Sequence, residues 1–391
     1  MQKKNNIRVI QIISLLQGMV FYASVSTLYR QQAGVSIFQI SVIESVSLAV
    51  SMALEVPWGI LADRIGHRKT MVWCSFLFFL SKIVFWKAEG FGGFLLERIL
   101  LAVTLAGLSG VDESILYASC GEDQYQKVYG HTQALGTLGM IFASMVCSLF
   151  IGNNYRLAGL FTAIAYGIAA VFSLFLSETK LPQKNKCSPF NSFRDSLRQV
   201  FRTKGLLGVI LCGAFFGEVT HTVTVFLNQL QYIRCGWGNS IISLAYILGT
   251  LAELSSACSE RLTRRIGEKH SGILLLMVSA SACVIMIFSL NGWISLGCIL
   301  AMGFSSALFT PLLSALENRL ITIDDRATAL SVSSLLTDSI AMLISLLMGR
   351  AAEHSLPFAM AVGAGTTLIA LVLYACAQPG GAKTYRRASE T

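Results

Sequence analysis

One carboxyl group and one imidazole lie a single helical turn apart in the middle of a long apolar segment. Glu218 and His221 are three residues apart, so on a helix they share a face. Two such groups, held away from bulk water, can share a proton and pass it on. The same pair can also form a hydrogen-bonded contact between packed helices. The residues alone leave both interpretations open, a proton carrier or a polar helix contact.

Polar side chains continue along the same segment. They follow three- and four-residue spacing and predict a broad polar stripe on one side of a helix, which consists of Thr222, Thr224, Asn228, Gln229 and Gln231. We expect Asn228 to contact a solute together with Glu218 and His221.

Three more acids fall inside apolar segments, namely Asp112, Glu113 and Asp338. A charged side chain at the centre of a membrane helix costs about 2.5 to 3.5 kcal/mol, so these acids must face the protein interior or be protonated. Asp112 and Glu113 are adjacent and point about 100° apart, so we expect one to face a cavity and the other to pack. We favour Glu113 for the cavity, because Ser109 and Tyr117 lie one turn either side of it. Asp338 is either a coupling acid or the cap of a polar helix contact.

The composition predicts the elements that hold these residues. The chain has 391 residues, of which 54% are hydrophobic and 13% charged, and its mean hydropathy is +0.64. This predicts an all-α integral membrane protein, because a bilayer core of about 30 Å needs about 20 apolar residues per helix. Twelve transmembrane helices can be placed at 7–28, 37–62, 71–86, 94–118, 131–151, 157–176, 206–233, 240–259, 271–290, 293–316, 327–349 and 356–377.

The basic residues predict the orientation. With the amino terminus inside, 23 of the 30 Lys and Arg residues fall on the inner side, which predicts a cell inner (plasma) membrane protein with both termini cytoplasmic. The net charge of +9 is explained by this asymmetry beside anionic lipid, so we expect the lipid bilayer and no nucleic acid as a partner. The ten cysteines form no Cys-x-x-Cys pair, so neither a disulfide framework nor a metal site is expected.

The chain also repeats itself. A shift of about 201 positions brings the run 63–69 onto 264–270, with a glycine at 66 and at 267, between the second and third helices of each half. We therefore predict two pseudo-symmetric six-helix bundles: an N-terminal bundle at 1–177, a cytoplasmic linker at 178–205 and a C-terminal bundle at 206–391.

The second predicted helix ends in a distinctive motif. Glu55, Gly59 and Asp63 recur every four residues and share one face, on which Gly59 permits the close approach of another helix. A basic turn follows directly, with Arg64, Gly66, Arg68 and Lys69. An acidic and small stripe at a helix end suits a helix contact that changes during function.

This motif, Gly59-x-x-x-Asp63-Arg64-x-Gly66-x-Arg68-Lys69, resembles the signature loop of the major facilitator superfamily. The stretches at 34–40, 55–59, 109–117 and 326–331 resemble a bacterial drug-efflux-like branch. The resemblance implies alternating access by two rocking bundles, driven by a proton or sodium gradient without a cofactor. It implies a conformational gate at the motif and a cavity lined by the first, fourth, seventh and tenth helices.

Two features depart from that branch. The second-half loop has Arg264 where the first has Asp63, and the fifth helix has Gly136-Thr-Leu-Gly139 without the Gly-Pro signature of proton antiporters.

Acids and aromatic residues, such as Phe21, Tyr22 and Phe309, with no arginine expected near mid-span, suggest a neutral or cationic amphiphile as the small-molecule substrate. We therefore predict proton-coupled export of small amphipathic compounds. The alternative is cation-coupled uptake of a small polar metabolite, which the missing Gly-Pro signature favours. A membrane-embedded enzyme is a remote third interpretation, since no catalytic motif is present. A monomer would suffice for transport.

Overall fold

The computed structural model is helical throughout its described part. It describes residues 2–109, 111–120, 122–151, 154–178, 205–252, 255, 258–320 and 326–377. The expected linker at 178–205 falls almost wholly outside these residues, so the domain boundaries at 177 and 206 stay a prediction.

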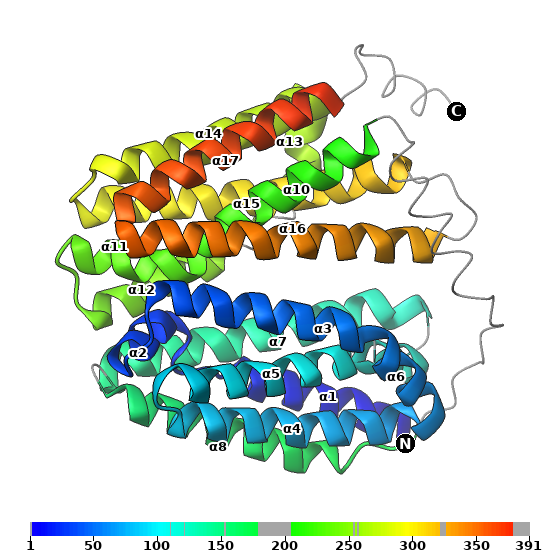
Figure 1. The fold of residues 1–391 in the computed structure, drawn as a ribbon. Coiled ribbons are helices and arrows are strands. Elements are labelled where there is room, and N and C mark those ends of the chain that lie inside the picture. Colours follow the sequence, from blue (N-terminus) through cyan, green and yellow to red (C-terminus); the bar gives the residue numbers. More distant parts are fainter. Residues whose placement is uncertain are drawn as a thin grey trace.

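The helices of the first half pack together as one bundle, the lower one in Figure 1. In chain order they are α1 (Gln2–Gly18), the 3₁₀-helix η1 (Ala23–Val25), α2 (Ser26–Gln32), α3 (Ile37–Ile65), α4 (His67–Lys87), α5 (Gly90–Leu108), α6 (Val111–Cys120), α7 (Glu122–Val146), the π-helix η2 (Cys147–Ile151) and α8 (Tyr155–Ser173).

The helices of the second half form the upper bundle. They are α10 (Leu206–His221), the π-helix η3 (Thr222–Leu227), α11 (Asn228–Arg234), α12 (Asn239–Ala252), α13 (Ser259–Ile266), α14 (Glu268–Phe288), α15 (Gly292–Leu320), α16 (Arg326–His354) and α17 (Leu356–Ala377). The end of the molecule where α8 ends and α10 begins is called the linker end below, and the opposite end, with α2 and α11, the distal end.

Within the described residues, eleven helical stretches are long and apolar enough to cross a membrane. Eleven of the twelve expected spans correspond to them. In the region of the expected span 240–259, α12 has only 14 residues, and residues 253–254 and 256–257 after it are outside the described part. Large apolar side chains such as Phe150, Phe288 and Trp293 are more than 70% exposed on the outside, as a hydrocarbon surrounding permits.

The predicted repeat is visible in backbone geometry. Gly66 joins α3 to α4 with φ 93° and ψ 143°, and Gly267 joins α13 to α14 with φ 83° and ψ 155°. Both values of φ lie in the region that favours glycine. The next helix starts alike in both loops, because the Thr70 amide donates to Gly66 O at 3.1 Å and the Ser271 amide to Gly267 O at 3.0 Å. The two halves thus contain the same turn at equivalent places.

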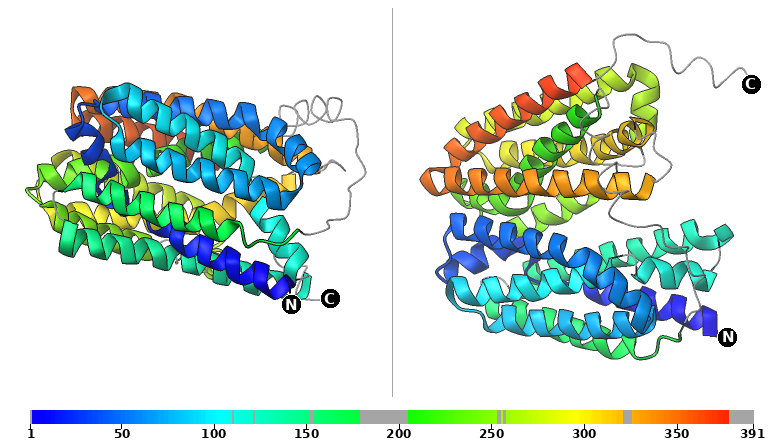
Figure 2. Two further views of the ribbon diagram at one scale, coloured as in Figure 1. Left: turned by 90° about the horizontal axis from the view of Figure 1, so that it is seen from below. Right: turned by 45° about the vertical axis from the view of Figure 1, so that its right-hand side comes forward.

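The two bundles touch mainly toward the distal end. Among the described residues, the hydrogen bonds between the halves join 24–45 and 140–155 of the first half to 229–246 and 342–353 of the second. In the right-hand view of Figure 2 the two bundles are seen apart, and α3 and α16, which contact each other, lie on their facing sides. The two bundles are therefore hydrogen-bonded to each other mainly at the distal end.

Within the first bundle, α1 and α7 approach each other at glycines. A Cβ atom on Gly18 would lie 2.1 Å from the carbonyl oxygen of Gly136, and one on Gly139 would lie 2.2 Å from the carbonyl oxygen of Leu15. Backbone atoms cannot yield as a flexible side chain can. The glycines of the fifth predicted helix thus serve close helix packing.

We expect Gly18→Ala to destabilise the protein by about 1–3 kcal/mol, because the added methyl group forces the backbones of α1 and α7 apart. The midpoint of thermal unfolding of the purified protein in detergent measures this effect. Gly59→Ala is the matched control, since no atom of the described structure lies within 4 Å of the Cβ position there. Equal midpoints for the two variants would contradict this view of the α1–α7 contact.

Candidate functional site

The centre of the seventh span holds the predicted acid and imidazole side by side. Nδ1 of His221 lies 3.8 Å from Oε2 of Glu218, and the Thr222 hydroxyl donates to Glu218 Oε1 at 2.9 Å. His221 is the last residue of α10, and the π-helix η3 begins at the next residue. A π-helical turn holds an extra residue in the helix and is frequent at functional sites.

Glu218 and His221 differ in their exposure. The Glu218 side chain is 9% exposed, whereas the His221 side chain is 53% exposed although it lies in the middle of a span. Glu218 also bonds to Ser345 of α16, and the charges of Glu44 and Asp338 act on it. The acid thus lies where α10, α16 and the first half converge, with the imidazole at its open side.

A second group of charges lies in the first half, close to the distal end. Glu44 on α3 accepts hydrogen bonds from Arg30 of α2, at 3.4 Å, and from Arg98 of α5. The Arg30 side chain is only 3% exposed. The charges of Glu44 and Arg98 act on His221.

A second ion pair in the first bundle is fully buried. Nζ of Lys82 on α4 is 3.5 Å from Oε1 of Glu97 on α5 and donates to the Tyr22 hydroxyl at 3.1 Å. The side chains of Lys82 and Glu97 are 5% and 1% exposed. The ammonium group also lies over the rings of Tyr22, Phe78 and Tyr166, at 5.1–5.8 Å from the ring centres. The rings partly replace the water that Lys82 has lost.

These charges correct one expectation. The sequence predicted no buried arginine near mid-span, yet Arg30 is buried and shares Glu44 with Arg98. Both arginines lie close to predicted span ends. The ion pair of Lys82 and Glu97 could have been predicted from the sequence, because charged residues inside or beside apolar spans usually pair with an opposite charge. The aromatic residues Phe21, Tyr22 and Phe309 are core residues with at most 7% exposure.

The acids of the fourth span lie toward the linker end. The span is interrupted after Ser109, and Asp112 and Glu113 occupy the first turn of α6. The Asp112 carboxylate accepts from the backbone N–H of Glu113 within this first turn. Glu113 is exposed and accepts from the Tyr129 hydroxyl at 3.3 Å. The rings of Tyr117, Tyr125 and Tyr129 contact each other in sequence beside it.

The rest of the polar stripe on the seventh span binds protein groups. Asn228 Oδ1 accepts from the Gln229 amide at 2.7 Å, and Gln231 donates to Ser295 Oγ and Ser289 O. Gln229 reaches across to the first half, where its Oε1 accepts from the amides of Thr27 and Leu28 at 2.9 and 3.3 Å. Those amides start α2, so the glutamine satisfies free donors of a helix beginning.

A carboxylate of the second half does the same for α3. Glu353 Oε2 on α16 accepts from the Phe38 amide at 2.9 Å and from the Ser36 hydroxyl at 3.0 Å, at the start of α3. We call the contacts of Gln229 and Glu353 with the first half the distal seal. In both, an acceptor of the second half binds the beginning of a helix of the first.

The residues of the signature motif lie at the linker end and are open in this conformation. Glu55, Gly59 and Arg64 are exposed, and no helix of the described part approaches Gly59 closely. The side chain of Asp63 is outside the described part. Arg68 donates to the carbonyl oxygens of Leu174 and Leu176 just after α8, and a Cβ atom on Gly66 would lie 2.9 Å from Glu178 Oε1. Lys69 is exposed on the first turn of α4.

Asp338 lies in the middle of α16 and is half-buried. The charge of Glu55 acts on it from α3, and its own charge acts on Glu218. The structure therefore brings Glu218 and His221 together, and the charge of Asp338 acts on Glu218. It places Glu113 and Asp112 elsewhere, on α6.

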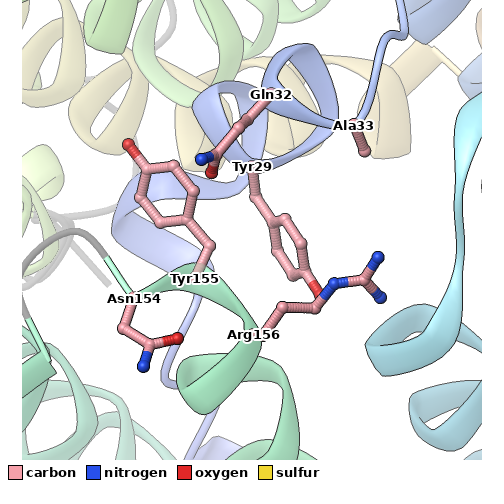
Figure 3. Close-up of a pocket in the computed structure, with 6 residues that line it drawn as sticks. All are labelled: Tyr29, Gln32, Ala33, Asn154, Tyr155 and Arg156. Atoms are coloured by element: carbon pink, nitrogen blue, oxygen red, sulfur yellow. The ribbon is translucent and has the colours of Figure 1, made fainter.

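A surface pocket of about 290 Å³ opens at the distal end of the first bundle (Figure 3). Its lining comes from α2 and the start of α8, with Tyr29, Gln32, Ala33, Asn154, Tyr155 and Arg156. Arg156 pairs with Glu89 at 3.1 Å, and both side chains are well exposed. The pocket is thus separate from the charges around Glu218. Among the described residues, no group of three or more His, Cys, Asp or Glu could hold a metal ion.

The comparisons with known proteins agree with this architecture. Residues 9–346 match the sequence profile of the Major Facilitator Superfamily. The uncharacterized transporter YxaM of this superfamily, from Bacillus subtilis (strain 168), is 24% identical over 243 residues, which are 60% of each chain. The chain thus spans less than two thirds of the length of this curated relative.

Solved structures share the fold. The nucleoside transporter NupG, in a mutant form, superposes with a TM-score of 0.82 at 15% identity and covers 96% of this chain and 100% of its own. A D-xylose–proton symporter superposes with a TM-score of 0.72 at 13% identity, covering 95% and 97%. These identities show a common fold only. Because the profile covers most of its length, the chain belongs to the Major Facilitator Superfamily and is a multi-pass membrane protein.

Proposed function

We propose that this chain is a proton-coupled transporter of a small polar solute in the bacterial inner membrane, with the Glu218–His221 pair as its proton carrier. The observation that carries the proposal is the position of the pair: a carboxyl group buried in the middle of a span, with an imidazole 3.8 Å away at its open side. A proton that enters through the half-exposed imidazole reaches the carboxyl group after a small side-chain movement or through one bridging water, because 3.8 Å is longer than a hydrogen bond.

The conformation supports alternating access. The distal seal holds the halves together at one end, while the motif face with Glu55 and Gly59 is open at the other. With the linker end in the cytoplasm, as the basic residues predict, this is an inward-open state of a monomer with both termini inside. Closing the linker end would then bring α16 onto the face of α3 that carries Glu55, Gly59 and Asp63, which is the gating role expected for this motif.

A polar solute fits the charged surroundings better than an amphiphile does. The charges of Glu44 and Asp338 act on Glu218 and that of Arg98 acts on His221, while Phe21, Tyr22 and Phe309 are used for packing. The structural neighbours include transporters named for a nucleoside and for D-xylose, which are polar solutes. Uptake together with protons is therefore the direction we favour.

Export of amphipathic compounds is a second candidate, on one specific observation. Glu113 lies exposed at the linker end beside the contacting rings of Tyr117, Tyr125 and Tyr129. An acid among aromatic rings suits a lipophilic cation entering from that side.

We expect Glu218→Gln to abolish solute-driven proton movement, with a loss of at least about tenfold, because glutamine keeps the shape and the hydrogen bond from Thr222 but cannot release a proton. Proteoliposomes with an internal pH-sensitive dye measure it, after addition of a panel of sugars, nucleosides, organic acids and lipophilic cations. The panel also separates the two candidate substrate classes.

The control is Glu260→Gln, an exposed acid at the start of α13 whose side chain is 70% accessible and pairs with Arg264. This variant should behave like the unmodified protein. Proton movement that survives in Glu218→Gln would rule out the Glu218–His221 pair as the carrier.

A further inference from the structure

The charges of the two ion pairs around Glu44 and Glu97 do not balance. Arg30, Arg98 and Lys82 are three cations, and Glu44 and Glu97 are two carboxylates. Lys82 and Glu97 neutralise each other, so Arg30 and Arg98 share the single carboxylate of Glu44. One positive charge is left over in a region of low polarity, where an uncompensated charge is costly.

The hydrogen bonds of the two arginines are also incomplete. Glu44 accepts from one nitrogen of each guanidinium, through Oε1 in both cases. The Nε atoms of Arg30 and Arg98 are buried and have no partner in the described structure. A guanidinium presents its donors as a planar fork that matches a carboxylate in pairs. The pair thus has both the charge and the donors for a second carboxylate.

The open side of this ion pair lies near the second half, because Ser45, next to Glu44 on α3, donates to Met342 O on α16 at 3.4 Å. Arg30 is sealed off at 3% exposure, whereas the side chains of Arg98 and Glu44 are 20% and 14% exposed. The charge of Glu44 acts on both Glu218 and His221, and that of Arg98 acts on His221. A small molecule held by Arg98 would therefore lie between the two halves of the transporter.

We propose that Arg98, backed by Arg30, binds the carboxylate of a small organic anion, and that Glu44 occupies the same guanidinium groups when the site is empty. This names the substrate class and rests on the proposed function, because it takes the space beside Glu218 as the transport site.

Charge balance then couples the anion to the proton. Among the groups that the structure describes, His221 lies beside Glu218, the charges of Glu44 and Asp338 act on Glu218, and those of Glu44 and Arg98 act on His221. When Glu218 carries a proton it is neutral, and the unbalanced arginine charge attracts an anion. When Glu218 loses the proton, its negative charge repels the anion. One anion and one proton would thus move together without net charge transfer.

The experiment compares acids with their uncharged amides on the purified full-length protein in detergent. Lactate and benzoate are tested against lactamide and benzamide at equal ionic strength with chloride, with the midpoint of thermal unfolding as the readout. We expect the two carboxylates to raise the midpoint and the two amides to leave it unchanged, because ligand that binds the folded state stabilises it.

Variants assign the effect to the site. Arg98→Gln should remove the stabilisation, and Arg98→Lys, which keeps the charge but loses the fork, should weaken binding about tenfold. Arg156→Gln, in the exposed pair with Glu89, is the matched control and should bind normally. If Arg98→Gln fails to fold, Glu44→Gln tests the site instead. Removing the competing carboxylate should strengthen benzoate binding.

Two outcomes overturn the inference: equal midpoints with acids and amides, or full stabilisation of Arg98→Lys and Glu44→Gln at unchanged affinity. Its failure differs from failure of the proposed function. Proton movement driven by neutral solutes and lost in Glu218→Gln would keep the proton carrier and reject the anion site. Stabilisation by benzoate that depends on Arg98, without proton movement, would keep the anion site and reject the carrier.

Discussion

Lys82→Met is expected to destabilise the protein by about 3–5 kcal/mol, the usual cost of leaving one partner of a buried ion pair alone. Lys82 and Glu97 are 3.5 Å apart at 5% and 1% exposure, so water cannot solvate the glutamate that remains. The second carboxylate oxygen of Glu97 already has no partner in the described structure. Thermal unfolding in detergent, followed with a dye that reacts with newly exposed thiols of buried cysteines such as Cys74 and Cys283, measures the loss.

Two further variants test the cause. Lys87→Met makes the same change at the exposed end of α4 and should have little effect. The double variant Lys82→Met with Glu97→Leu should recover most of the stability, because an apolar pair often replaces a buried ion pair at little cost. A double variant as unstable as the single one would mean that Lys82 stabilises the bundle through its aromatic neighbours instead.

The second large effect concerns the distal seal. We expect Gln229→Leu to shift the conformational equilibrium at least about tenfold toward the state that is open at the distal end. The leucine leaves the Thr27 and Leu28 amides buried without an acceptor, at about 1–3 kcal/mol for each such group, and about 1.4 kcal/mol corresponds to a factor of ten. In the open state water can satisfy the same amides, so only the sealed state is penalised.

Labelling of a single cysteine at Ser243 in a cysteine-free background measures this shift. Ser243 is buried against Ser24 at 2.9 Å, and a membrane-impermeant maleimide should react with its replacement about tenfold faster when Gln229 is leucine. Gln231→Leu is the control two residues away, because Gln231 is equally buried but bonds to Ser289 and Ser295 within its own half. Equal acceleration in both variants would show a general loosening of the protein and not a broken seal.

The fold could be predicted from the sequence because the hydropathy pattern locates the membrane spans and the repeat indicates two equivalent halves. The pair of glycines at 66 and 267 marked equivalent turns, and both have the same backbone conformation. The hydropathy pattern could not predict where a span is interrupted. The first span changes direction between Gly18 and Ser26 while its residues stay apolar or small, so hydropathy continues across the break. The α5–α6 interruption after Ser109 is of the same kind.

The site could be predicted only where one helix contained it. Glu218 and His221 are neighbours within α10, and their contact follows from helical spacing. The π-helix η3 then changes the rotational phase, so the stripe expected for a regular helix divides: Asn228, Gln229 and Gln231 bind protein groups instead. The cluster around Glu44 joins α2, α3 and α5, and no spacing in a single sequence reports which helices become neighbours.

The distal seal has one more property, which concerns how the protein can change over evolutionary time. Both acceptors, Gln229 and Glu353, bind backbone N–H groups of the first half. A backbone donor is present whichever side chain stands there, except proline. Substitutions at Thr27, Leu28 and Phe38 can therefore accumulate without removing these bonds, while each acceptor can be lost in a single step. Selection that preserves the distal seal therefore acts mainly on the second half, which supplies the two acceptors. A lineage that adapts its first half to a new solute keeps the seal as long as Gln229 and Glu353 are unchanged.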